Sequence, residues 1–404
     1  MSLNATPWAE RTQITFFGKT NAGKSSIVNA FTGQSLSIVS EIAGTTTDPV
    51  YKAMELLPLG PVQIIDTPGI DDEGILGKQR VQKTMQVLNR TDIAIVVIDA
   101  CAGADETEKK LLEKITEKKI PYLLVWNKSD LLSSVPEGDE NNIWVSAKTG
   151  FHINELKNLT AKIASLSEKE NHLISDLLST GDFVILVVPI DKAAPKSRLI
   201  LPQQQTIRDI LEAGAVPIVV RDTELDAVIK KFPSVKMVIT DSQVFSYVSS
   251  VVPKEIPLTS FSILMARYKG DLPAQIAGVK AIEKLQNGDK VLIAEGCTHH
   301  RQCDDIGSVK LPHWICEYTK VQPEFCFCSG REFPQDLSEY KCIIHCGGCM
   351  LNEREMKYRL GYVQSKKIPI TNYGTLIAYI NGILPRTIAP FSDVAAILEQ
   401  NEKL

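Results

Sequence analysis

The 404-residue sequence has no long apolar run and no surplus of positive charge. A membrane-spanning helix needs about 20 consecutive apolar residues, whereas apolar runs such as Ile93–Ile98 have only the length of a strand. The 44 Lys and Arg residues against 48 Asp and Glu residues give a net charge of −4, although a protein that coats nucleic acid is normally basic. The N-terminal residues also lack the pattern of a signal peptide. We therefore expect a cytoplasmic protein that works with neither membranes nor nucleic acid.

Cysteine is scarce in most of the chain and concentrated near its end. Of nine cysteines, eight lie between Cys297 and Cys349, and four of the six histidines lie in the same window. Without an export signal, a disulfide framework is not expected, and clustered Cys and His in a cytosolic chain indicate metal or redox chemistry. The 44% hydrophobic and 23% charged residues are typical of a soluble globular protein.

The order of the apolar and amphipathic segments predicts an α/β fold with several domains. Strand-like and helix-like segments alternate over residues 1–168, which favours a parallel sheet covered by helices. A smaller α/β unit without a recognisable catalytic motif follows over 169–265, and residues 266–404 carry the cysteines. The expected strands are Thr12–Phe17, Val62–Asp66, Ala94–Asp99, Tyr122–Asn127, Ile143–Ser146, Phe183–Val188, Val216–Val220, Val235–Thr240 and Lys290–Ala294. The expected helices include Lys24–Phe31, Gln79–Asn89, Glu106–Lys119, Gln203–Glu212, Glu224–Lys231, Ala274–Leu285, Glu353–Gln364, Gly374–Asn381 and Asp393–Gln400.

A phosphate-binding loop follows the first expected strand. Residues Gly18–Ser25 match the pattern GxxxxGK[ST] between a strand and a helix, which is the setting that this loop requires. Its glycines let backbone amides converge on phosphate oxygens, and the helix N-terminus adds a positive dipole end. We expect Lys24 to contact the β- and γ-phosphates and Ser25 to bind Mg²⁺. The residues expected to contact the nucleotide here are Gly18, Asn21, Ala22, Gly23, Lys24, Ser25 and Ser26.

Three further motifs follow later apolar strands, at the sheet edge where open α/β proteins bind ligands. Asp66–Gly69 (DTPG) places a carboxylate near the metal and the Gly69 amide near the γ-phosphate. In Asn127–Asp130 (NKSD), the Asp130 carboxylate has the two acceptors that the N1–H and amino group of guanine require. The third motif is Ser146-Ala147-Lys148. We expect Asn127, Lys128, Asp130, Ser146, Ala147 and Lys148 to contact the base.

This ordered set of motifs resembles the GTPase domain of translation factors. Within that superfamily, Gly44–Asp48 resembles the first switch of tRNA-modification GTPases, which implies that Thr46 senses Mg²⁺ and that Lys24, Thr46, Asp66 and Gly69 take part in catalysis. Ile70 stands where Ras-like enzymes have a water-orienting glutamine, and such glutamine-less enzymes commonly need another charge at the transition state. Asn21 lies where potassium-dependent relatives hold K⁺, although asparagine is also favoured in turns for its own sake.

The C-terminal cysteines form the pattern Cys297-Thr-His299, then 45 residues, then His345-Cys346-Gly-Gly-Cys349. Both halves follow apolar strands, so both can emerge from one sheet edge. Three thiolates and an imidazole could hold an iron–sulfur cluster or Zn²⁺, and a redox dithiol or simple packing are further alternatives. A structural zinc site normally closes with four firm ligands, so three cysteines favour a cluster. We interpret the remaining cysteines as mainly structural: Cys303, Cys316, Cys326, Cys328 and Cys342.

The combination of these three regions resembles the FeFe-hydrogenase maturation GTPases, the HydF family, over the whole chain. The resemblance implies a 4Fe-4S cluster on Cys297, Cys346 and Cys349, with His345, His299, Asp304 or Asp305 as candidate fourth ligands. It also implies a homodimer formed by the middle domain, and a scaffold that receives a di-iron subcluster precursor from radical-SAM maturases and delivers it to apo FeFe-hydrogenase. GTP, Mg²⁺ and K⁺ are the other expected cofactors. The alternative is a tRNA-modification or ribosome-assembly GTPase with a structural zinc site.

Overall fold

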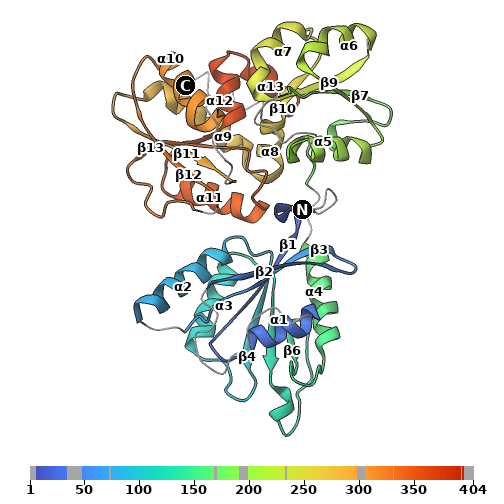
Figure 1. Cartoon of the computed structure of the whole chain (residues 1–404), viewed down its shortest axis with the longest axis vertical. Helices are drawn as coiled ribbons and strands as arrows, with labels where there is room; N and C mark the ends of the chain where they lie inside the picture. The colour runs from blue at the N-terminus through green and yellow to red at the C-terminus, as the bar shows by residue number, and fades with distance from the viewer. Residues whose placement is uncertain are drawn as a thin grey trace. The chain divides into compact units, whose positions relative to one another are not determined.

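The computed structural model describes residues 6–33, 48–71, 74–167, 171–190, 199–232, 234–297, 305–330, 332–392 and 394. The chain forms two compact units, Met1–Glu170 and Asn171–Leu404, which are drawn in Figure 1. Each contains parallel sheets between helices, which confirms the predicted α/β fold. Among the described residues, every helix is too short or too polar to span a bilayer.

The first unit is built on a six-stranded sheet with the order β2-β3-β1-β4-β5-β6. All neighbouring strands are parallel except β2, which runs antiparallel to β3 at the edge. The helices lie on both faces (Figure 1). The strands are β1 (Thr12–Gly18), β2 (Val50–Leu56), β3 (Gly60–Asp66), β4 (Ile93–Asp99), β5 (Tyr122–Asn127) and β6 (Asn142–Trp144), and the helices are α1 (Lys24–Thr32), α2 (Gly74–Leu88), α3 (Glu106–Glu117) and α4 (Ile153–Ser167).

Burial on both faces explains why the central strands of this unit are almost entirely apolar. Along β4, side chains alternate between the two faces. Ile93, Ile95 and Val97 pack with α1 and α4, whereas Ala94, Val96 and Ile98 pack with α2 and α3. The continuous run that the sequence shows here is therefore typical of a buried parallel strand.

The second unit contains two four-stranded parallel sheets, β10-β9-β7-β8 and β12-β11-β13-β14. Their strands are β7 (Phe183–Val187), β8 (Val216–Val220), β9 (Val235–Thr240), β10 (Leu258–Ser260), β11 (Lys290–Glu295), β12 (Glu324–Ser329), β13 (Tyr340–His345) and β14 (Ile370–Asn372). The helices are α5 (Leu201–Glu212), α6 (Leu225–Lys231), α7 (Phe245–Val251), α8 (Phe261–Lys269), α9 (Leu272–Val279), α10 (Leu311–Thr319), α11 (Glu353–Ser365), α12 (Tyr373–Ile380) and α13 (Leu384–Ile388).

One hydrophobic core joins these two sheets. It contains Ile185 and Val238 from the first sheet and Ile293 and Ile344 from the second, with the buried helix α8 between them in sequence. The domain boundary expected after residue 265 falls inside α8. The sequence did not indicate this helix, because nearly all of its residues are buried and it therefore lacks a polar face of helical period.

Most of the predicted elements are confirmed, with shifted ends. The helix expected over Ala274–Leu285 is α9 followed by a 3₁₀ turn at Lys280–Lys284. The edge strand β2 was not predicted, because its outward residues are exposed and it has no apolar run. Except for residue 394, the helix expected over Asp393–Gln400 lies outside the described residues.

Arg386 fastens α13 to the segment between α7 and β10. Its guanidinium donates to the carbonyl oxygens of Ser249 at 3.1 Å, Val252 at 3.0 Å and Pro253 at 2.6 Å. A charged donor at the end of α7 stabilises carbonyls that the helix leaves without partners.

We expect Arg386→Met to lower the free energy of unfolding of the second unit by about 2–3 kcal/mol, because it removes charged hydrogen bonds. Chemical denaturation followed by circular dichroism measures the change. Arg208→Met is the matched control, since Arg208 is exposed and pairs only with Glu212 on its own helix. Equal effects of the two substitutions would show that Arg386 has no such role.

Candidate functional site

Two positions of the phosphate-binding loop lie so close to neighbouring segments that only glycine fits there. Gly23 has φ of 86°, and a Cβ there would lie 2.2 Å from Nδ2 of Asn127. A Cβ on Gly18 would lie 2.2 Å from the carbonyl oxygen of Val97 on β4. The buried Lys24 side chain folds back over the loop and donates to the carbonyl oxygen of Lys19 at 2.6 Å. The loop therefore presents its backbone amides and one ammonium group together, as phosphate binding requires.

The two groups predicted around Mg²⁺ are in direct contact. The Ser25 hydroxyl at the start of α1 donates to Oδ2 of Asp66 at 2.7 Å, and Asp66 is fully buried at the end of β3. A hydroxyl and a carboxylate are the hard oxygen donors that Mg²⁺ prefers, so these residues fit the ion. When bound, Mg²⁺ would neutralise charge on the phosphates.

Ile70 packs into the protein interior instead of facing the phosphate loop. Its side chain is buried in the core with Phe17 and Leu88, while its amide donates to the carbonyl oxygen of Gly18 at 3.3 Å. A Cβ on the preceding Gly69 would lie 2.1 Å from the Thr20 hydroxyl, so this segment passes very close to the loop. The Ile70 side chain therefore cannot orient a water molecule. Thr46 and the rest of the expected first switch up to residue 47 lie outside the described residues.

Asn127 forms hydrogen bonds both to the phosphate loop and to the Ser146-Ala147-Lys148 motif. Its Nδ2 donates to the carbonyl oxygen of Ala22 at 3.0 Å, and its Oδ1 accepts from the amide of Ala147 at 3.2 Å. The Ser146 hydroxyl donates to Oδ1 of Asp130 at 2.6 Å and thereby orients that carboxylate. The structure thus brings the phosphate loop, the Asn127–Asp130 motif and the Ser146 motif together.

Lys128 adopts a left-handed backbone conformation, with φ of 66°, that directs its side chain toward the end of β4. Its ammonium donates to Oδ2 of Asp99 at 2.6 Å. Burial alone would raise the pKa of Asp99, but the hydrogen bond from Lys128 and the amide of Cys101 hold that pKa below its ordinary value. The sequence did not indicate Asp99 as the partner of Lys128, because an acidic residue at the end of a strand has no distinctive spacing.

The second predicted site lies where β11 and β13 end. These neighbouring parallel strands pair Ala294 with His345, so the segments that carry Cys297 and Cys346 leave the sheet side by side. The Cys346 thiol accepts from the amide of Gly296 at 3.0 Å and from the amide of Gly348 at 3.3 Å. Gly348 has φ of 66°, and a Cβ there would lie 2.5 Å from Sδ of Met356. One amide from the segment after β11 and one from the loop after β13 are therefore directed at the Cys346 sulfur.

The three predicted cysteines are half-buried, and their thiols share a low-dielectric environment. Burial raises the pKa of Cys297 and of Cys346 to about 12, and the neighbouring Cys349 adds to both shifts. Burial also raises the pKa of Cys349, which the Lys269 ammonium opposes. Ionising all three thiols in this environment costs free energy unless a positively charged group binds beside them. The donor set thus fits a cationic group, and iron of a cluster would supply both the charge and the sulfur bonds.

Within the described ranges, no three Cys, His, Asp or Glu side chains converge closely enough to hold a single metal ion. An ion such as Zn²⁺ needs all its ligands within about 2.0–2.3 Å of one point. A cluster instead presents a different iron to each thiolate, so its ligands stand further apart.

His345, one of the four candidate fourth ligands, has both ring nitrogens in contact with other groups of the protein. Side chains alternate across β13, and His345 faces α11 whereas Cys346 packs into the core on the other face. Its Nδ1 lies 2.8 Å from the carbonyl oxygen of Cys346, and its Nε2 lies 3.3 Å from Nη1 of Arg359. Burial, assisted by the Arg359 charge, lowers the pKa of His345 to about 3, so both nitrogens of a neutral ring are engaged.

The other candidate fourth ligands are placed differently. Asp305 accepts from the amide and the hydroxyl of Ser308 at 2.8 and 2.7 Å, at the start of a short π-helical turn. Its charge and that of Glu295 both contribute to the raised pKa of Cys297, so both carboxylates lie near this thiol. His299, Asp304 and Cys303 lie outside the described residues.

Lys269 is a residue of this site that the sequence did not reveal. It is 3% exposed at the end of α8, and its ammonium donates to the carbonyl oxygens of Cys349 at 3.0 Å and Leu351 at 2.9 Å. A single lysine after an apolar segment resembles an ordinary helix end. Cys326 and Cys328 lie on β12 and pack against one hydrophobic cluster, as predicted for structural residues.

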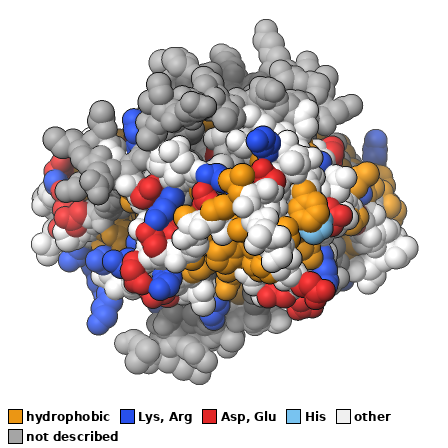
Figure 2. Space-filling view, turned by 90° about the horizontal axis from the view of Figure 1, so that it is seen from below, with side chains coloured by type: hydrophobic (Ala, Val, Ile, Leu, Met, Phe, Trp, Pro, Cys, Tyr) orange, Lys and Arg blue, Asp and Glu red, His pale blue; other side chains and the backbone are white. Residues whose placement is uncertain are grey.

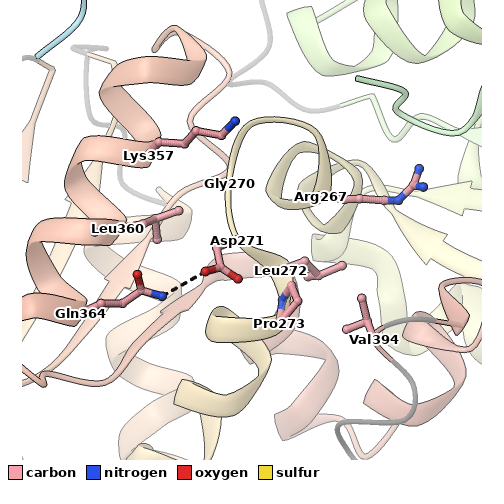
Figure 3. Close-up of a pocket in the computed structure, with 10 residues that line it drawn as sticks. Arg267, Gly270, Asp271, Leu272, Pro273, Lys357, Leu360, Gln364 and Val394 are labelled. Carbon is pink, nitrogen blue, oxygen red and sulfur yellow. Dashed lines mark hydrogen bonds between the residues drawn. The ribbon is translucent and has the colours of Figure 1, made fainter. Parts of the chain in front are cut away.

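A separate pocket of about 360 Å³ lies between the turn after α8 and the helix α11 (Figure 3). Asp271 on its wall accepts from Nε2 of Gln364 at 3.0 Å, and Arg267 pairs with Asp176. None of the predicted site residues lines this pocket. Its charged groups are engaged with the protein, so we assign it no part in the chemistry.

Three family models together match most of the chain. Residues 273–390 match the hydrogen maturase F tetramerization domain, and residues 173–270 match the hydrogen maturase F dimerization domain. Residues 13–128 match the 50S ribosome-binding GTPase model. These matches confirm the predicted GTPase domain and the HydF resemblance of the rest.

Similar curated proteins cover only the first part of the chain. The tRNA modification GTPase MnmE of Endomicrobium trichonymphae is 37% identical over 186 residues, which are 43% of this chain and 40% of that protein. MnmE of Legionella pneumophila (strain Corby) is 32% identical over 170 residues, 41% of this chain and 37% of that protein. The matched part thus spans about two fifths of these relatives.

Solved structures are also similar in part. Aquifex aeolicus Era bound to GDP·AlF₄⁻ has a TM-score of 0.35 with 20% identity, over 59% of this chain and 97% of that one. NFeoB of S. thermophilus bound to GDP·AlF₄⁻ and K⁺ has a TM-score of 0.31 with 22% identity, over 38% of this chain and 61% of that one.

We expect Asp130→Asn to weaken GTP binding at least about tenfold, because an amide sets a donor against the donors of guanine and a charged hydrogen bond contributes about 1.5–3 kcal/mol. The same variant should gain affinity for xanthine nucleotides. Fluorescence titration with labelled GTP and XTP measures both. Glu137→Gln is the control, since Glu137 is an exposed acidic residue of the same unit. Unchanged GTP affinity in the Asp130 variant would contradict this assignment.

Proposed function

The chain belongs to the hydrogen maturase F family, and we propose that it is a GTP-hydrolysing scaffold that carries an iron–sulfur precursor of FeFe-hydrogenase. The single observation that carries the scaffold role is the set of three half-buried, neighbouring thiols that follow β11 and β13. The proposed partners are radical-SAM maturases, which supply the di-iron precursor, and the apo-hydrogenase, which receives it. A homodimer formed through the 173–270 domain is part of the proposal.

GTP is the proposed substrate of the first unit. Lys24 and the amides of the phosphate loop would bind the β- and γ-phosphates, and Ser25 with Asp66 would hold Mg²⁺. Asp130, oriented by Ser146, would accept from guanine. Because Ile70 is buried and offers no polar group, the charge that assists hydrolysis has to come from elsewhere. We propose that K⁺ supplies it at the exposed side chain of Asn21.

A 4Fe-4S cluster is the proposed cofactor of the second unit, and Cys297, Cys346 and Cys349 would hold it. Two amides already directed at the Cys346 sulfur would stabilise negative charge there. Three thiolates leave one iron for a weaker ligand, and such an open position suits a protein that accepts and releases a precursor. For that position we favour a carboxylate near Cys297, Glu295 or Asp305, or solvent, over His345, whose ring nitrogens contact other groups. The predicted His299 and Asp304 stay candidates.

The alternative of a tRNA-modification GTPase accounts for less of the molecule. Resemblance to MnmE covers 43% of the chain and leaves the cysteine site without a role. Figure 2 shows Lys and Arg side chains interspersed with Asp and Glu on one face, rather than a basic stripe of the kind that binds RNA.

We expect that replacing any one of Cys297, Cys346 and Cys349 by serine abolishes retention of the cluster after anaerobic reconstitution. Iron analysis and electron paramagnetic resonance of the reduced protein measure this. Cys316→Ser and Cys326→Ser are the controls, because these thiols lie on α10 and β12, away from the loop amides. An equal loss of iron in the Cys326 variant would contradict the three-cysteine assignment and indicate a site with four thiolates.

GTP hydrolysis should be slow, and faster in KCl than in NaCl of equal ionic strength. Asn21→Ala should remove this difference without preventing GTP binding, because the phosphate contacts come from other residues of the loop. Phosphate release under saturating GTP measures the rates, and Lys24→Ala provides the inactive control. Equal rates of the unsubstituted protein in the two salts would refute the potassium part of the proposal.

A further inference from the structure

A chain of hydrogen bonds runs from α11 to the cysteine loop. Arg359 on α11 is fully buried, and its Nε donates to Oε1 of Glu355 at 2.9 Å. Its Nη2 donates to the carbonyl oxygen of Gly330 at 2.8 Å, and its guanidinium stacks 5.1 Å from the ring of Phe333. The remaining nitrogen, Nη1, lies 3.3 Å from Nε2 of His345. The guanidinium is therefore held on several sides with one N–H directed at the histidine.

Arg359 determines which nitrogen of His345 carries the proton. A guanidinium has only donors and is always charged, so Nε2 of His345 has to act as the acceptor. The proton of the neutral ring then lies on Nδ1, where it donates to the carbonyl oxygen of Cys346 at 2.8 Å. The opposite tautomer would set two donors against each other at Nε2 and two acceptors at Nδ1.

We propose that Arg359 and His345 are positioning residues that hold the Cys346 loop ready for the cluster. The Cys346 amide donates to the carbonyl oxygen of Ala294 at 2.9 Å, so the two hydrogen bonds together fix both peptide groups that flank this residue. Its thiol then meets the amides of Gly296 and Gly348. His345 acts through the backbone of a ligand, on the sheet face away from the thiols. The proposal rests on the cluster-binding role proposed above.

Two nearly isosteric variants separate positioning from ligation. In His345→Asn the amide nitrogen lies near the place of Nδ1 and keeps a donor for Cys346, whereas in His345→Gln it lies near the place of Nε2 and loses that donor. We expect the Asn variant to retain the iron content and the electron paramagnetic resonance spectrum of the unsubstituted protein. The Gln variant should lose iron to a chelator about tenfold faster, as is typical when a residue that supports a metal ligand is changed. His313→Gln, at an exposed position on α10, is the control.

The tautomer of His345 can be determined in the apoprotein, without a bound cluster. In the apoprotein labelled with ¹⁵N-histidine, the resonances that vanish in the His345→Asn variant should show Nδ1 protonated between pH 6 and 8. Arg359→Lys, which keeps the charge but cannot make the same three contacts, should shift this signal. A protonated Nε2, or a Gln variant that keeps iron as well as the unsubstituted protein, would overturn the proposal. An Asn variant that loses iron as completely as Cys346→Ser would overturn it in favour of ligation.

These outcomes remain distinct from failure of the proposed function. If the unsubstituted protein binds no cluster, the scaffold role fails, and the apoprotein tautomer still tests the link between Arg359 and His345. If the unsubstituted protein binds a cluster that the Gln variant holds equally well, the scaffold role stands and the positioning role fails. Thermal unfolding of each variant confirms that the comparison is made on folded protein.

Discussion

The partial burial of three neighbouring cysteine thiols is the constraint on which the second unit depends. Ionised, they would place several negative charges in an interior that already contains Glu295, a buried carboxylate, and Asp305 close to it. One buried ammonium, Lys269, opposes this charge, and it is occupied with the carbonyl oxygens of the loop. A resident cationic group resolves this imbalance, whereas a protein that used these cysteines for packing alone would need neither the loop amides directed at sulfur nor the lysine.

Both units use the same feature of parallel sheets to assemble their sites. Every strand of a parallel sheet ends at the same edge, so segments far apart in the sequence meet there. In the first unit this edge brings Asp66, Asn127 and the phosphate loop into contact. In the second it places the Cys297 and Cys346 segments on adjacent strands. The predicted nucleotide site and the predicted cysteine site therefore both lie at the edge where the parallel strands of a sheet end.

The sequence alone predicted the parts of each site that have a fixed spacing. These parts are short patterns with defined chemistry, namely the phosphate loop, the later nucleotide motifs and the three cysteines. Buried parallel strands could also be predicted, because they appear in the sequence as apolar runs. Lys269, Arg359 and Asp99 could not be predicted, because each is a single charged residue whose role comes from partners distant in the sequence. His345 was one of four candidate fourth ligands implied by the family resemblance, and the contacts of its ring with Arg359 and the Cys346 carbonyl could not be predicted from its position next to Cys346.

The most direct test of the central claim is anaerobic purification of the unsubstituted chain, followed by metal and sulfide analysis. The account predicts a brown protein with iron and acid-labile sulfide in equal amounts, thiolate-to-iron absorption that bleaches on reduction, and a paramagnetic reduced state. A colourless protein with one zinc per chain and no sulfide would contradict it and identify the cysteines as a structural zinc site.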